Sequence, residues 1–175
     1  MSGRTRSAGR AVGFALAALI GAGCGDRAVN ESPSSTATIR VAPTCDPTDQ
    51  DRYVYRPARL QAVLPCVRVA GTIVASSTEA DGDVHLDVRL DDAYVGFLNA
   101  GNLQEGGNLV VEPVCRFAPV QAEAIRVCAS DPDPLTGALP GVGEHVWLEG
   151  RYALDLQHHA WAELHPLYRW GRVEP

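Results

Sequence analysis

Histidine and carboxylate side chains occupy alternate positions in two stretches of this chain. The first stretch carries Asp83, His85 and Asp87, and the second carries Glu163 and His165. Side chains two positions apart on a β-strand share one face and lie about 6.5 to 7 Å apart. A histidine and a carboxylate at that spacing can bind one metal ion, because zinc accepts both as ligands. The candidate metal ligands are therefore His85, Asp87, Glu163 and His165.

Neither stretch supplies three converging ligands by itself, whereas a zinc site usually has three or four. A solvent-exposed polar face is therefore the simpler interpretation, and we expect no metal or other cofactor. Glu163 and His165 could also act as a general acid and base. The sequence contains no Gly-x-Ser-x-Gly, no His-Glu-x-x-His and no phosphate-binding loop. A non-enzymatic role is therefore favoured over catalysis, and the catalytic residues stay unknown.

The elements that would position these side chains are strands, and the clearest two form a hairpin over residues 144–173. Both arms alternate with period two, which is typical of half-buried strands. Residues 157–159 are predicted to turn the chain between the arms. The alternation predicts a core-facing side that consists of Val146, Leu148, Tyr152, Leu154, Ala162 and Leu164.

Two tryptophans lie on the opposite face of this hairpin. Trp147 and Trp161 belong to neighbouring arms, and we expect their rings to stack across the hairpin. Such a pair either forms a platform for a ligand or is covered by the N-terminal part of the chain, and we favour covering. Trp147, Trp161 and His159, at the turn, are the candidate ligand-binding residues.

Three more strands are predicted upstream, at residues 66–76, 83–90 and 108–115. Short helices are predicted at residues 57–64, where prolines flank the segment, and at residues 118–127. The second strand alternates most regularly. Its pattern directs Val84, Leu86, Val88 and Leu90 to the core and Asp83, His85, Asp87 and Arg89 to solvent.

The N-terminal residues are predicted to be an export signal. Residues 1–10 carry three arginines and no acid, and residues 11–23 are apolar or small, which is typical of a secretory signal peptide. The apolar run is too short to span a bilayer as a transmembrane helix. Residues 20–24 resemble the lipobox of bacterial lipoproteins, with glycine at position 21 where leucine is usual. The resemblance implies that Cys24 is lipidated; the alternative is an ordinary signal peptide that leaves a free thiol.

The chain therefore divides into a signal peptide (1–23), a flexible tether (24–40), an N-terminal unit (41–65) and a β-domain (66–175). We expect secretion across the cytoplasmic membrane and attachment by the lipid to the bacterial cell envelope. The formal net charge is -6, and without residues 1–23 it is -9, from 12 arginines against 21 acids. Such a charge opposes binding to a phosphate backbone, so nucleic acid is not the expected partner.

The four remaining cysteines are predicted to form two disulfides between sequence neighbours. Of the three possible pairings, Cys45–Cys66 and Cys115–Cys128 each close a proline-containing loop beside a strand end. The first bond would fasten the N-terminal unit to the β-domain and stabilise it by about 3 kcal/mol in the chain-entropy model.

The order of three strands, an irregular or helical excursion and two strands resembles the OB-fold, a five-stranded Greek-key barrel. The ending Trp-Ala-Glu-Leu-His-Pro is also similar to that of uncharacterised extracellular bacterial domains with such a barrel, and a small β-sandwich is the alternative. Three functions stay open. The first is a non-enzymatic envelope module that binds a protein partner or small ligand, the second a metal-dependent hydrolase, and the third an oligonucleotide-binding domain.

Overall fold

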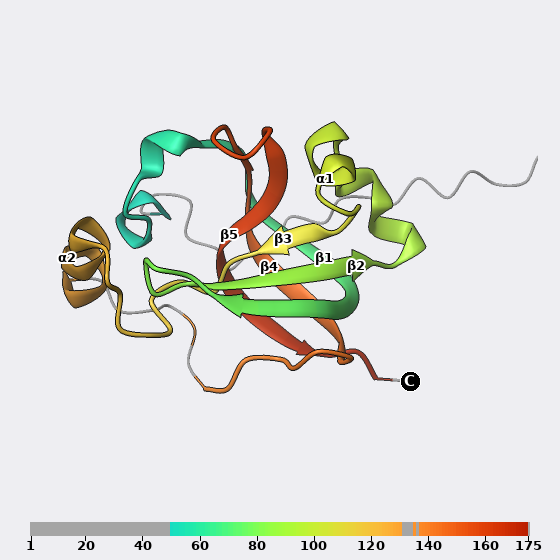
Figure 1. Ribbon diagram of the computed structural model, residues 1–175. Helices are drawn as coiled ribbons and strands as arrows, with labels where there is room; N and C mark the ends of the chain where they lie inside the picture. The colour runs from blue at the N-terminus through green and yellow to red at the C-terminus, as the bar shows by residue number, and fades with distance from the viewer. Residues whose placement is uncertain (1–49, 131–134, 136, 175) are drawn as a thin grey trace, which may run out of the picture. The chain divides into compact units, whose positions relative to one another are not determined.

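The computed structural model describes residues 50–130, 135 and 137–174 (Figure 1). The described residues are mainly β, as predicted, with short helices between the strands. Cys24, Cys45 and the predicted signal and tether lie outside them. Within the described residues, no helix is long and apolar enough to cross a membrane. The strands are β1 (Leu60–Thr78), β2 (Val84–Leu90), β3 (Leu109–Val111), β4 (His145–Asp155) and β5 (Trp161–Arg172). The helices are η1 (Gln50–Tyr53), η2 (Pro57–Arg59), η3 (Asp92–Phe97), α1 (Ala100–Gln104) and α2 (Ala122–Ser130).

The five described strands form one sheet that closes on itself in the order β1-β2-β3-β5-β4, because β4 pairs back onto β1. β3 and β5 are parallel, and the other described pairings are antiparallel. β1 serves two neighbours along its length, and its register shifts at residues 62–67 and 73–75. A Cβ atom on Gly71 would lie 2.5 Å from the carbonyl oxygen of Arg89, so the close approach of β1 and β2 requires glycine there.

The helix predicted at residues 57–64 is wrong. Pro57 opens only the short η2, and β1 begins at Leu60, whose backbone pairs with Asp155 of β4. Strand pairing with a distant segment overrides the local helical preference, which is a weak determinant by itself. The third strand is shorter than predicted, and α2 begins at Ala122, four residues later than the predicted helix.

The apolar interior of the ring agrees with the predicted alternation. Val84, Leu86, Val88 and Leu90 are buried, and the hairpin contributes further buried side chains to the same cluster. These are Val146, Leu148, Ala162 and Leu164, with Tyr152 and Leu154 half-buried against them.

The opposite face was predicted to be accessible, and for Asp83 this is wrong. Asp83 is buried, His85 and Asp87 are half-buried, and only Arg89 is exposed. Asp83 is enclosed because its carboxylate accepts a hydrogen bond from the backbone nitrogen of Cys115, beyond β3. Glu149, Arg151, Glu163 and His165 on the polar face of the hairpin are buried as well.

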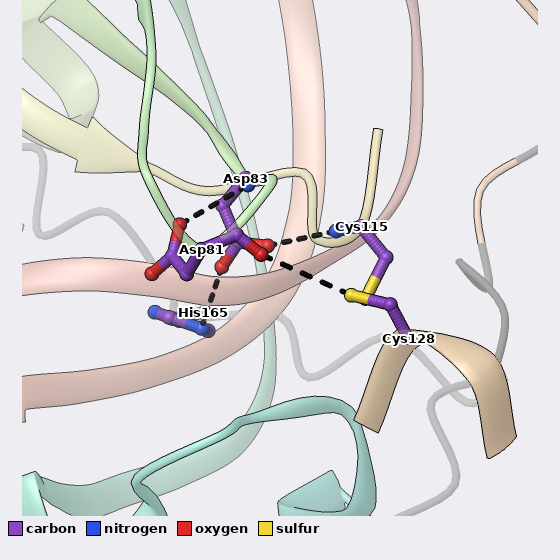
Figure 2. Close-up of a disulfide and its surroundings, with 5 residues drawn as sticks. All are labelled: Asp81, Asp83, Cys115, Cys128 and His165. Atoms are coloured by element: carbon purple, nitrogen blue, oxygen red, sulfur yellow. Dashed lines mark hydrogen bonds and ion pairs between the residues drawn. A yellow bond between two sulfur atoms is a disulfide. The ribbon is translucent and has the colours of Figure 1, made fainter. Parts of the chain in front are cut away.

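Disulfide Cys115–Cys128 is confirmed, and it joins the chain after β3 to α2 (Figure 2). Cys66 is also disulfide-bonded. The predicted bond from Cys66 to Cys45 falls on a partner outside the described residues, so the pairing stays a prediction. A bond between Cys66 and Cys115 is excluded, because Cys115 pairs with Cys128.

Candidate functional site

A pocket of about 550 Å³ opens beside the polar end of the strands. Its walls come from the β1–β2 connection, β2, the end of β3, the β4–β5 turn and η2. The side chains that line it include Asp81, His85, Glu112, His158, Trp161 and Arg59.

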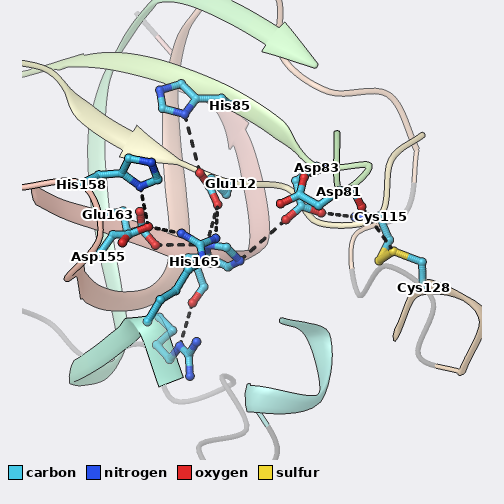
Figure 3. A network of polar contacts seen from close by, with 12 residues as sticks. Asp81, Asp83, His85, Glu112, Cys115, Cys128, Asp155, His158, Glu163 and His165 are labelled. Carbon is cyan, nitrogen blue, oxygen red and sulfur yellow. Dashed lines mark hydrogen bonds and ion pairs between the residues drawn. A yellow bond between two sulfur atoms is a disulfide. The ribbon is translucent and has the colours of Figure 1, made fainter. Parts of the chain in front are cut away.

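Glu112 is the residue that joins the pocket to the interior. It follows β3 directly, and the parallel pairing of β3 with β5 brings it beside His165: its backbone nitrogen donates to Leu164 and its carbonyl accepts from Leu167. Glu112 Oε2 lies 2.5 Å from His165 Nδ1, and Oε1 lies 3.6 Å from His85 Nδ1. Figure 3 shows Glu112 between the two imidazole rings.

His165 lies beneath the pocket and is 0% exposed. Its Nδ1 atom is 3.0 Å from Glu163 Oε1 as well as close to Glu112, and its Nε2 atom is 3.8 Å from Asp83 Oδ2 (Figure 3). Burial lowers the pKa of His165, but the charges and hydrogen bonds of Glu112 and Glu163 outweigh it and raise the pKa to about 10. Without a bound metal ion, the His165 imidazole is therefore a cation among carboxylates.

The carboxylates around His165 differ in their pKa. Burial raises the pKa of Asp83 to about 7, against the opposing charge of His165. Burial and the charge of Glu112 raise the pKa of Glu163. Burial also disfavours the charge of Glu112, but the neighbouring His165, His85 and Arg59 outweigh it and hold the Glu112 pKa well below its usual range. The surroundings thus favour the charged form of Glu112 and disfavour that of Asp83 and Glu163.

Arg59 is the second buried cation. The backbone of Leu156 donates to its carbonyl, which holds η2 against the end of β4. Its guanidinium forms an ion pair with the fully buried Asp155 and lies 3.5 Å from Glu112 Oε2. Burial lowers the Arg59 pKa, but the charges of Glu112, Glu163 and Asp155 more than compensate and raise it. We refer to Asp83, Glu112, Asp155, Glu163, His165 and Arg59 as the buried cluster.

Trp161 is held at the wall of the pocket from several sides. Its ring stacks on His158 at 4.7 Å and meets the edge of His85 at 5.6 Å. Its indole nitrogen donates to Glu163 Oε2 at 2.8 Å. α1 approaches the start of β5 closely, because a Cβ atom on Gly101 would lie 2.7 Å from the Trp161 backbone. Trp161 therefore couples the pocket to the buried cluster.

A histidine in the β4–β5 turn completes the wall. His158 Nδ1 lies 2.9 Å from Asp155 Oδ2, so Asp155 contacts both Arg59 and His158.

His85 forms the other histidine–carboxylate contact of the pocket, with Asp87 Oδ1 3.6 Å from its Nε2 atom. The nearby Glu112 carboxylate raises the pKa of His85 and outweighs burial.

The four predicted metal-ligand candidates all lie in this region, but in two layers. His85 and Asp87 line the pocket, whereas Glu163 and His165 are buried below it. The sequence interpretation missed Glu112, which connects the layers, and also Asp155. The signal that could have identified Glu112 is its position as a charged residue in the apolar run of residues 109–114.

The predicted stack of Trp147 on Trp161 is wrong. The hairpin register pairs Trp161 with Asp155 near the turn and Trp147 with Gly171 near the open end. Trp147 contacts the Arg68 guanidinium at 4.2 Å and lies against Gly171. His159 is exposed, contacts Glu105 and does not line the pocket. Of the three candidate ligand-binding residues, Trp161 alone lines the pocket.

No protein-family model matches this chain, and no curated protein matches it. The function therefore has to be inferred from the pocket and the buried cluster.

Proposed function

We propose that the protein is an envelope-anchored lipoprotein whose OB-like barrel binds a small polar ligand in the pocket beside Trp161. The observation that carries the proposal is the pocket itself. Its volume of about 550 Å³ falls within the range of about 300 to 1,000 Å³ that is typical of small-molecule sites. Trp161, His85 and Arg59 provide an aromatic surface and converging hydrogen-bonding groups.

The position of the pocket supports an OB-like Greek-key assignment. OB-folds bind their ligands at strands two and three and at the loops between strands one and two and strands four and five. This pocket is lined by Asp81 from the first of those connections, His85 from β2, Glu112 after β3 and His158 from the β4–β5 turn.

The charges of the lining select the class of ligand. Four carboxylates (Glu79, Asp81, Asp87 and Glu112) face the pocket together with one arginine. Such a surface repels phosphate groups, so an oligonucleotide fits less well than a neutral or cationic molecule. Sugars and small amines have that chemistry.

Crystals of the full chain soaked with neutral sugars, diamines and mononucleotides test this function. We expect a sugar or an amine beside Trp161, and a Trp161→Leu variant should lose it. Trp147→Leu is the matched control, since Trp147 lies at the other end of the hairpin. Occupancy by the mononucleotide alone, or ligands that bind only elsewhere, would contradict the proposal.

The lipid anchor has its own test. Cys24→Ser should abolish fatty-acid labelling and release the protein from the membrane fraction. Unchanged membrane association of that variant would remove the lipoprotein part of the proposal and leave the pocket unaffected.

A metal-dependent hydrolase is the second candidate, and the contacts of Glu112 favour it. The Glu112 carboxylate contacts both His85 of the pocket wall and His165 of the interior. A histidine that can act as a general acid or base therefore lies beside a carboxylate that can bind a metal ion. Turnover separates the two functions: a pocket ligand recovered unchanged supports binding. A product released by the wild type and not by His85→Ala supports hydrolysis.

A further inference from the structure

We propose that Asp83, Glu112 and His165 bind one divalent transition-metal ion, such as Zn²⁺, beneath the pocket. This site stands whichever of the two functions above is correct, because it depends on the buried cluster and not on the pocket ligand. Two of its three residues, Asp83 and Glu112, were not among the candidates chosen from the sequence as metal ligands.

The geometry brings one ligand atom from each residue together. The three atoms lie within 4.8 Å of one another, and all three residues are buried. Zinc holds nitrogen and oxygen ligands at about 2.1 Å, so two ligands of one ion are at most about 4.2 Å apart. Closing the site on His165 Nε2 requires the Glu112 side chain to turn away from Nδ1, which it contacts at 2.5 Å.

His165 supplies the observation that separates this group from an ordinary acidic cluster. Its Nε2 atom is fully buried and makes no hydrogen bond with any residue that the structure describes. Asp83 Oδ2 is 3.8 Å away, which is too long for a hydrogen bond. The same distance is within the limit of about 4.2 Å for two ligands of one ion. A buried nitrogen without a hydrogen-bond partner is costly, and coordination would remove that cost.

The other nitrogen of His165 is already held as a metal-binding histidine requires. Metal-bound histidines usually donate their second ring nitrogen to a carboxylate, which fixes the ring. Glu163 lies 3.0 Å from His165 Nδ1, and Glu163 is itself held by the indole of Trp161 at 2.8 Å. Because Glu163 can keep the Nδ1 hydrogen, Glu112 is available to turn toward the ion.

The charge of the buried cluster also favours a cation. Four carboxylates (Asp83, Glu112, Asp155 and Glu163) face two cations, Arg59 and His165. Buried charges are costly unless they are paired. A divalent ion would add positive charge where carboxylates outnumber the cationic side chains. Glu112 also lines the pocket, which gives the ion a route of entry.

Calorimetric titration of the full chain with Zn²⁺, after chelation of bound metal and alkylation of any free thiol, tests the proposal. We expect one ion per chain with a Kd of micromolar or below. Asp83→Asn and Glu112→Gln should each weaken binding at least tenfold. Asp91→Asn is the matched control, because Asp91 follows β2, contacts His145 and lies outside the ligand group, and this variant should bind Zn²⁺ as the wild type does.

A second measurement uses the wild type alone, in case the variants do not fold. Co²⁺ in place of Zn²⁺ should give visible absorption that saturates at one equivalent, and anomalous scattering from a Zn²⁺-soaked crystal should place the ion between Asp83 and His165. Stoichiometric binding that the Asp83 and Glu112 variants retain would overturn the proposal. So would an ion found only at the exposed His158 or His159, or the absence of stoichiometric binding.

Discussion

Both faces of the first half of β5 are buried, but they contain opposite kinds of side chain. Ala162 and Leu164 point into the apolar interior of the ring, and Glu163 and His165 point the other way, and all four are 0% exposed. The inner face is closed by other strands of the sheet, whereas the outer face is closed by Glu112 and Asp83 from near the ends of β3 and β2. Alternation along a strand therefore distinguishes the apolar face from the polar face, but it does not show whether the polar face meets water.

The largest expected effect comes from breaking an ion pair on the buried outer side. Asp155→Ala should lower the free energy of unfolding by about 3 to 5 kcal/mol, because it removes the carboxylate closest to the buried Arg59 guanidinium. Urea denaturation measures this. The control is Asp91→Ala, which removes an exposed contact with His145 and should cost about 1 kcal/mol or less. Equal costs for the two variants would mean that the cluster is effectively solvated.

A similar or slightly smaller loss is expected from the inner face. Leu86→Ala should destabilise the protein by about 2 to 5 kcal/mol, because Leu86 is 1% exposed in the apolar cluster. Leu156→Ala offers a control of the same chemistry at an exposed turn and should change stability by about 0.5 kcal/mol or less. If Leu86→Ala behaved like Leu156→Ala in thermal unfolding, the assigned register of β2 would be incorrect.

The disulfide Cys115–Cys128 lies on the outer side and holds the loop after β3 beside Asp83. Replacing Cys115 and Cys128 together by serine should cost about 3 kcal/mol for a separation of 13 residues. Since Cys115 donates to Asp83, the same variant should also bind Zn²⁺ more weakly. Retention of full stability and full affinity in the double variant would show that the loop after β3 does not position the site.

The smallest effect is expected at the pocket wall. His85→Ala should cost about 1 kcal/mol or less, because His85 is half-buried and its contacts with Glu112 and Asp87 are 3.6 Å long. Denaturant unfolding checks the value. A cost close to that of Asp155→Ala would place His85 within the buried cluster and not at the boundary of the pocket.

The inner face of the fold could be predicted from sequence because it depends on a local rule. Leu86 and Leu164 alternate with polar neighbours, and period-two alternation is sufficient to assign them to a core. The candidate residues His85, Asp87, Glu163 and His165 were found in the same way. The alternation did not predict that these four residues lie in one region, because they belong to strands that are distant in sequence.

The parts that sequence did not predict depend on contacts between segments distant in the chain. Glu112 reaches His165 only because β3 and β5 pair in parallel, and Asp155 is enclosed only because η2 packs at the end of β4. The Trp147–Trp161 stack failed for the same reason, since the position of the turn sets the register of the whole hairpin. The spacing of residues along one strand carries no information about such contacts.

A binding site on the outer face of β5 responds to a metal ion, whereas a purely structural network does not. The indole signals of the three tryptophans, followed by NMR during a Zn²⁺ titration of the full chain, test this difference most directly. Trp161 donates to Glu163, which holds His165, whereas Trp147 and Trp170 lie toward the other end of the hairpin. We expect the Trp161 signal to shift and to saturate at one equivalent while the other two stay in place. A Trp161 signal that does not respond, or three signals that drift together, would contradict the binding site.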